Sequence, residues 1–112
     1  MQGYNASVFA YGSTGAGKTY TMLGTEENPG IMMNSIDELF VTIENYTAER
    51  DYKIKISYVE VYNENIKDLL TDRSDYLELR EDNLKGICVA GVTEIMTTNV
   101  DEIMRYIRQG NR

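Results

Sequence analysis

The stretch that decides the fold is residues 12–19, which read Gly12-Ser13-Thr14-Gly15-Ala16-Gly17-Lys18-Thr19. They match G-x-x-x-x-G-K-[S/T], a loop whose glycines let the backbone turn so that successive N–H groups point inward at phosphates. Residues 7–11, just before the loop, are a mostly apolar run that predicts a strand buried on both faces. A helix can begin at Lys18, so the sequence predicts the strand-loop-helix context that a phosphate-binding loop needs.

Two side chains of this loop carry the expected chemistry. Lys18 is expected to reach the β- and γ-phosphates of a nucleotide, and the Thr19 hydroxyl to coordinate Mg²⁺, which prefers oxygen ligands. GTPases, ATPases, small-molecule kinases and motors share such a loop, so the motif names no reaction. It leaves open another P-loop enzyme (a small-molecule kinase or a GTPase), a non-catalytic nucleotide-binding interaction domain, and a plain glycine-rich turn with an exposed lysine.

No complete catalytic set is visible beside the loop. Hydrolysis needs a second acidic residue to hold Mg²⁺ and a group to position water, and none of the 18 acidic residues ends an apolar strand in the manner typical of that role. Glu60, in the middle of the strand-forming run Val59-Glu60-Val61, is interpreted as a structural partner, because a buried carboxylate persists when it is paired.

The composition excludes several other classes. The chain has 112 residues, which is one domain at most, and its formal charge of −7 argues against binding to nucleic acid or anionic lipid. Cys88 is the one cysteine, so no internal disulfide is expected. No apolar run approaches the ~18 residues that insert in a membrane, and the first residues lack the basic region of a secretory signal.

The remaining periodicities predict a mixture of helices and strands. Ser35 as N-cap and Glu38 three residues on predict a helix from about residue 36 to residue 45. Residues 52–62 alternate with period two and predict one long strand. A short helical segment is expected next, at Ile66, Leu69 and Leu70.

The last third of the chain predicts short strands and a helix. Residues 76–80 form one expected strand, and residues 87–96 hold one or two more around Gly91. Asn99 is the expected cap of a final helix that Gly110 ends, with an apolar stripe at Val100, Ile103, Met104 and Ile107. The fold class is therefore α/β, mixed rather than strictly alternating.

Four blocks of the sequence resemble the kinesin motor domain, in the same order. Residues 3–22 are similar to the kinesin P-loop block beyond the generic motif, through the FAYG lead-in and the K-T-x-T-M exit. Residues 57–64 (SYVEVYNE), with Ile66 and the Asp68-Leu69-Leu70 that follow, resemble the kinesin strand S-x-x-E-[IV]-Y-N-E-x-[IV]-x-D-L-L. The other blocks are residues 29–32 with 36–40, and residues 91–94 with 102–104 and 110–112. Residues 76–82 and 89–94 look closest to class-eight kinesins.

The resemblance implies a microtubule-based motor that couples ATP hydrolysis to movement, in the cytoplasm and on the microtubule cytoskeleton. It assigns the nucleotide cradle for ATP and Mg²⁺ to Gly12, Ser13, Thr14, Gly15, Ala16, Gly17, Lys18 and Thr19. Tyr20 stands where the family often has a histidine near the adenine, and an aromatic ring can still stack there. Residues 81–91 would form a loop that touches tubulin, weakly because few basic residues lie there. The parent motor can be a dimer.

The resemblance also implies that residues 1–112 are a partial kinesin motor domain, from the P-loop block to the start of the third major helix. The expected fold is a P-loop NTPase-type three-layer α/β fold with a mixed central sheet, incomplete in this chain. The family's adenine-contacting R-x-R-P strand would precede Met1, and its γ-phosphate-sensing N-x-x-S-S-R-S-H loop would follow Arg112. We therefore expect the intact parent to be an ATPase and the 112 residues alone to be inactive.

Overall fold

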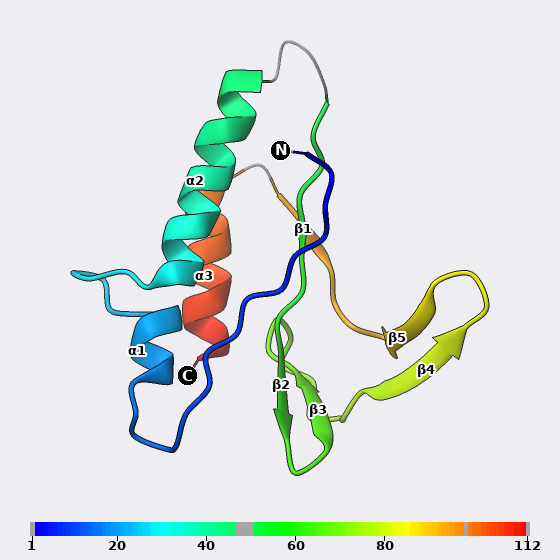
Figure 1. Cartoon of the computed structure of the whole chain (residues 1–112). Coiled ribbons are helices and arrows are strands. Elements are labelled where there is room, and N and C mark those ends of the chain that lie inside the picture. Colours follow the sequence, from blue (N-terminus) through cyan, green and yellow to red (C-terminus); the bar gives the residue numbers. More distant parts are fainter. Residues whose placement is uncertain (1, 47–50, 98, 112) are drawn as a thin grey trace. The chain divides into compact units, whose positions relative to one another are not determined.

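The computed structural model describes residues 2–46, 51–97 and 99–111 (Figure 1). The chain divides into two compact units, Met1–Asn45 and Tyr46–Arg112, each of which is described by itself. The first contains the helices α1 (Lys18–Met22) and α2 (Ile31–Tyr46, which extends one residue past the boundary). Among the described residues, no helix has the length and apolar character needed to cross a membrane.

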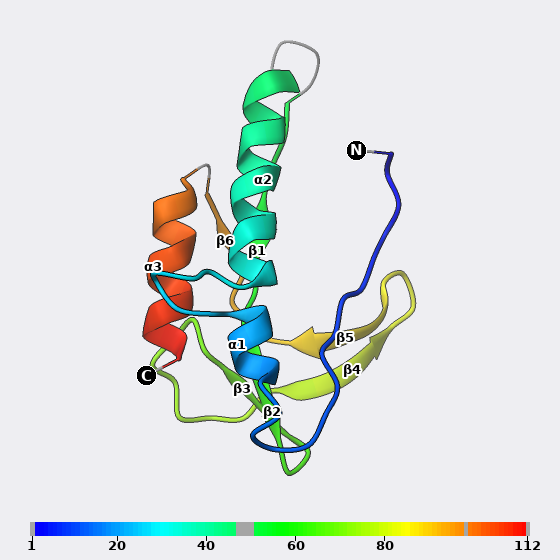
Figure 2. The ribbon, with the colours of Figure 1, turned by 60° about the vertical axis from the view of Figure 1, so that its left-hand side comes forward.

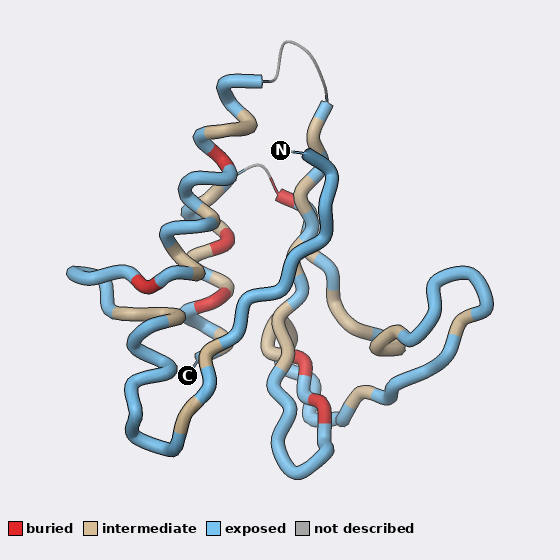
Figure 3. The backbone as a smooth tube through the Cα atoms, viewed as in Figure 1, coloured by how far each residue is buried: buried red, intermediate tan, exposed pale blue. Residues whose placement is uncertain are grey.

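The segment that leads into the glycine loop is extended but unpaired. The structure assigns no strand to residues 7–11, most of which are exposed (Figure 3). Phe9 and Tyr11 are 84% and 97% exposed. The prediction of a strand buried on both faces is therefore wrong for this chain. A buried strand needs a hydrogen-bonded neighbour on each side, and no strand in the described part of the chain pairs with this segment. The helix predicted at Lys18 is confirmed as α1.

α2 starts one turn earlier than the sequence predicted. The carbonyl oxygen of Gly30 accepts a bond from the N–H of Asn34 at 3.1 Å, which is already the first helical hydrogen bond. Ser35 thus lies inside α2, and its predicted role as N-cap is wrong. The turn before the helix, residues 24–30, is closed by a bridge between Gly24 and Pro29.

The described residues of the second unit form six short strands and one helix. The strands are β1 (Lys55–Ile56), β2 (Val59–Tyr62), β3 (Asn65–Asp68), β4 (Glu78–Asp82), β5 (Gly86–Ala90) and β6 (Ile95–Met96). They pair antiparallel as β1 with β6, β2 with β3, and β4 with β5 (Figure 2). Within the described residues the strands form three two-stranded sheets, which agrees with a predicted sheet that is incomplete in this chain. The α/β class itself is confirmed.

The long strand predicted over residues 52–62 is divided between two of these sheets. The expected alternation of half-buried and exposed side chains runs from Tyr52 to Tyr58. The ladder then changes partner: Ile56 lies opposite Ile95, whereas Val59 lies opposite Asp68. The alternation of apolar and polar residues predicted which side chains point inward. It carries no information about which strand pairs with which, so it could not predict the change from β6 to β3.

A tight hairpin replaces the short helix predicted around Leu69. Asn63 and Glu64 have φ values of 49° and 66°, so both central residues of the two-residue turn are left-handed, as in a type I′ turn. The chain reverses and continues as β3, in which Ile66 and Asp68 face inward and are buried. The helix prediction is wrong because the turn leads directly into a strand, in which every second side chain, starting at Ile66, points inward.

The last elements follow the sequence prediction closely. β4 begins at Glu78, two residues later than expected, and β5 and β6 flank Gly91, whose φ is +77°. α3 (Val100–Gly110) is capped by the Asn99 side chain, which accepts bonds from the Asp101 and Glu102 N–H groups at 2.9 and 3.3 Å. Within α3, Ile103 and Ile107 are the buried members of the apolar stripe, and with Ile66 they form the core of this unit.

Candidate nucleotide-binding loop

The loop over residues 12–19 curves because of two left-handed glycines. Gly15 has φ +85° and Gly17 has φ +101°, a region that side chains with a Cβ rarely adopt. Gly17 is the N-cap residue of α1, so the chain changes from loop to helix at this glycine. Both sharp bends of the loop thus occur at residues that adopt them without steric strain.

Hydrogen bonds within the loop bring its two ends together. The Lys18 Nζ donates to the carbonyl oxygen of Gly12 at 2.7 Å, and the Ala16 N–H donates to the Ser13 carbonyl oxygen at 3.0 Å. A Cβ added to Gly12 would lie 3.2 Å from the Ala16 Cβ, so this glycine permits a close approach. The ammonium group of Lys18 is therefore held back over the loop that precedes it.

The side of the loop that a ligand would approach is open. The residues from Ser13 to Tyr20 are all exposed, and Tyr20 is 60% exposed. A Cβ built on Gly15 or Gly17 meets no atom within 4 Å. All nine predicted site residues, Gly12 to Tyr20, therefore lie together in one accessible bend that runs into the first turns of α1.

The residues present suit a metal that arrives with a nucleotide. Among the described residues, no three histidine, cysteine, aspartate or glutamate side chains are grouped so that they could hold an ion. Thr19 offers one exposed hydroxyl directly after Lys18. Mg²⁺ is commonly bound through one or two protein oxygens together with phosphates and water, so a single hydroxyl fits a nucleotide-borne ion.

Among the described residues, the buried carboxylate is that of Asp68, whose burial the sequence did not predict. Glu60, interpreted as a buried partner, is instead exposed, opposite Lys67 in the β2–β3 ladder. Asp68 is 2% exposed, and its Oδ1 and Oδ2 accept bonds from the N–H groups of Leu70 (3.0 Å) and Thr93 (2.8 Å). Period-two alternation from Asn65 onward was the signal that could have identified it.

These bonds also determine the charge of Asp68. Burial opposes ionisation and acts to raise the pKa of the carboxyl, but the hydrogen bonds from Leu70 and Thr93, with the nearby charge of Arg73, outweigh it. The pKa of Asp68 therefore lies below its ordinary value. With both oxygens engaged, Asp68 ties β3 to the segment before β6 and is not available as a metal ligand.

The sequence of this chain matches the kinesin motor domain over residues 1–112. The human kinesin-like protein KIF19 is 53% identical over the whole chain, and the kinesin-like protein KIN-8B of Arabidopsis thaliana is 48% identical over 99% of it. Human KIF18B is 46% identical over the whole chain. The predicted likeness to class-eight kinesins is confirmed by these relatives.

Solved kinesin structures share the fold. One described as the structure of a fast kinesin has a TM-score of 0.91 and 38% identity over 96% of this chain. A KIF14 dimer in a two-heads-bound state, with AMP-PNP and in complex with a microtubule, has a TM-score of 0.85 and 38% identity over 92% of this chain.

The match covers a small part of each relative. The chain spans 11–14% of the length of the three relatives named above, and 30–32% of the two solved kinesin chains. Within that part the agreement extends across both units, from the glycine loop to α3. The chain belongs to the kinesin motor domain family.

Proposed function

We propose that this chain is the ATP·Mg²⁺-binding portion of a microtubule-based motor, with residues 12–19 as the nucleotide cradle. The observation that carries the proposal is the 2.7 Å bond from Lys18 Nζ to the Gly12 carbonyl, which holds the charge over a bend made by Gly15 and Gly17. A cation and the N–H groups of a tight turn together form a binding environment for phosphate oxygens.

Each neighbouring side chain has a distinct proposed task. Lys18 turns from the Gly12 carbonyl toward the phosphates, or bridges the two. The Thr19 hydroxyl provides an oxygen ligand for Mg²⁺, and the exposed ring of Tyr20 stacks on the adenine. The nucleotide, when bound, supplies the phosphate whose transfer to water releases energy. The chain's own residues bind it and fix its orientation.

The similarity of this chain to solved kinesins supports the proposal that its parent protein is a motor. The KIF14 relative was solved as a dimer with AMP-PNP on a microtubule, and the fast kinesin was described in terms of its ATPase mechanism and its interactions with microtubules. We infer that the parent of this chain hydrolyses ATP, moves along microtubules in the cytoplasm and can work as a dimer. Residues 1–112 would then be part of its motor domain.

The proposed tubulin-facing loop, residues 81–91, lies mainly in the β4–β5 hairpin. Its cations are few: Lys85 is exposed, and Arg80 at its base pairs with Glu78 at 3.5 Å. An exposed pair of this kind contributes little binding energy. With a chain charge of −7, electrostatic attraction of this segment to acidic tubulin is proposed to be weak.

Membership in the kinesin family argues against a small-molecule kinase or a GTPase. The remaining alternative, a non-catalytic nucleotide-binding domain, can be tested by enzyme kinetics. ATP hydrolysis by the full-length protein is measured with and without microtubules. The proposal requires that microtubules raise the hydrolysis rate. Nucleotide binding with no stimulation at any microtubule concentration would instead favour the non-catalytic interaction domain.

A further inference from the structure

The last turn of α3 meets the base of the β2–β3 hairpin at Gly110, opposite Tyr58, just before β2, and Leu69, just after β3. A Cβ on Gly110 would lie 2.8 Å from the Leu69 carbonyl oxygen and 3.0 Å from both the Leu69 Cβ and the Tyr58 Cδ1. The φ of Gly110 is not left-handed, so close approach, and not backbone conformation, is the reason for glycine here. The helix thus comes as near to the hairpin as its backbone allows.

A side-chain hydrogen bond joins the same elements one residue later. The Tyr58 hydroxyl donates to the Oδ1 of Asn111 at 2.5 Å. Asn111 is the C-cap residue of α3, and its own N–H donates to the Ile107 carbonyl oxygen at 3.1 Å. Tyr58 is fixed in turn, because its carbonyl oxygen accepts the N–H of Leu69 at 2.8 Å.

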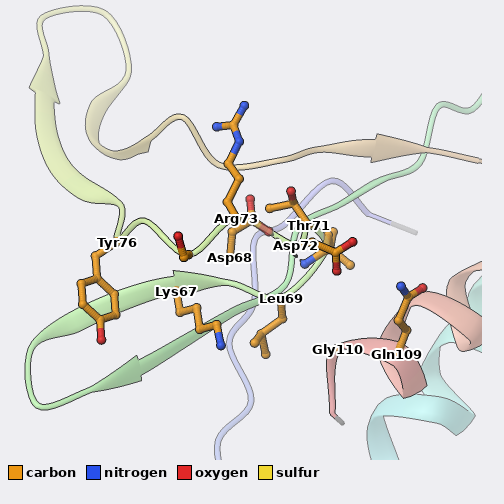
Figure 4. A pocket seen from close by; sticks show the side chains of 11 residues that line it. Lys67, Asp68, Leu69, Thr71, Asp72, Arg73, Tyr76, Gln109 and Gly110 are labelled. Carbon is orange, nitrogen blue, oxygen red and sulfur yellow. Dashed lines mark hydrogen bonds between the residues drawn. The ribbon is translucent and has the colours of Figure 1, made fainter.

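The last residues of α3 carry exposed side chains. Gln109 and Asn111 are exposed, and Gln109 and Gly110 border a pocket of about 440 Å³ beside the loop that follows β3 (Figure 4). The buried side chains of the helix lie one and two turns earlier, at Ile107 and Ile103. Exposed helix ends fray unless they are tied down, so the contacts of Gly110 and Asn111 with the hairpin can decide how firmly this end is held.

We propose that Tyr58, Gly110 and Asn111 form a latch that ties the end of α3 to the β2–β3 hairpin, so that the two elements move together. The bond suits this role at neutral pH. Burial raises the pKa of the Tyr58 hydroxyl; the bond to Asn111 lowers it in part, and the charge of Glu60 raises it further. The net shift is upward, so the hydroxyl keeps the proton that it donates.

The test is a double-mutant cycle read by hydrogen exchange in the full-length protein. Tyr58→Phe and Asn111→Ala each remove one partner, and Tyr62→Phe is the matched control, because Tyr62 is 72% exposed at the tip of the same hairpin. After correction for intrinsic rates, each single change should speed exchange of the residue-111 amide by roughly three- to tenfold, the factor expected for one net hydrogen bond.

The latch also predicts how the two changes combine. Because they break the same bond, the double variant should exchange no faster than either single variant, and Tyr62→Phe should match the unchanged protein. The proposal is overturned if Tyr58→Phe leaves exchange at residue 111 unchanged, if the two effects multiply, or if Tyr62→Phe has an equal effect.

Discussion

The ammonium nitrogen of Lys18 lies 2.7 Å from the carbonyl oxygen of Gly12, six residues earlier in the chain. This bond spans the glycine loop and brings its two ends together. It can form because Gly15 and Gly17 adopt left-handed conformations between the ends. Nucleotide affinity should therefore depend on backbone shape as well as on charge.

Gly17→Ala should weaken nucleotide binding although it removes no polar group. Alanine at φ +101° costs roughly 1–2 kcal/mol, and relief of that cost would distort the bend. We expect the Kd for an ATP analogue to rise about 5- to 30-fold. Gly3→Ala is a matched control, since Gly3 also has a left-handed φ (+82°) and open space around it. Equal losses of affinity in both variants would show that general strain, and not loop shape, is responsible.

Asp68→Asn should destabilise the second unit. The amide group keeps one acceptor oxygen but sets an NH₂ against one of the two backbone N–H donors, Leu70 or Thr93. We expect a loss of roughly 1–3 kcal/mol in the free energy of unfolding at neutral pH, measured by urea unfolding. Asp75→Asn, an exposed change nearby, should have little effect.

The effect of Asp68→Asn on the free energy of unfolding should depend on pH. The folded-state pKa of Asp68 is lowered, so its stabilisation is fully present above the unfolded-state pKa, about 3.9. It is lost as pH falls through the folded-state value. The difference in the free energy of unfolding between the unchanged protein and Asp68→Asn should therefore become smaller below about pH 4. A gap that stays constant, or widens in acid, would contradict the assignment.

Glu64→Gly should stabilise the β2–β3 hairpin. Glu64 has φ +66° at the second turn position, where a type I′ turn prefers glycine. Glycine removes roughly 1–2 kcal/mol of backbone strain at this position, which is more than the entropy it loses on folding costs. We therefore expect the free energy of unfolding, measured with urea, to rise by about 0.5–1 kcal/mol. Glu64→Ala, which keeps the strain, should give no gain. A gain of similar size from alanine would show that loss of the carboxylate, and not the φ value, is the cause.

Local signals predicted α1, α3 and the bend of the glycine loop, because each depends on residues within about one turn. Asn99 followed by Asp101 and Glu102 supplies a complete cap, and the glycines of the loop permit its bends wherever it lies. The errors arose where distant partners decide. Residues 7–11 have strand composition, but no strand in the part of the chain that the structure describes pairs with them. Residues 52–62 change partner between Ile56 and Val59. Asn63-Glu64 was missed because glutamate rarely occupies a left-handed turn position.

The 112 residues by themselves should not turn over ATP at a motor-like rate. Among the described residues, no strand pairs with the segment that leads into the loop, so no sheet fixes the start of the proposed cradle. Phosphate release from ATP by this chain, with and without microtubules, should stay at the level of a Lys18→Ala variant. Microtubule-stimulated turnover by the 112 residues would contradict this expectation.

The most direct test of the account is titration of a fluorescent ATP analogue into the full-length protein and its Lys18→Ala variant. Lys85→Ala, an exposed lysine in the turn between β4 and β5, serves as the matched control. The account predicts that Lys18→Ala weakens binding by about 10- to 100-fold, the range for a charged hydrogen bond of roughly 1.5–3 kcal/mol, whereas Lys85→Ala leaves it unchanged. Undiminished affinity in Lys18→Ala would contradict the assignment of residues 12–19 as the nucleotide cradle.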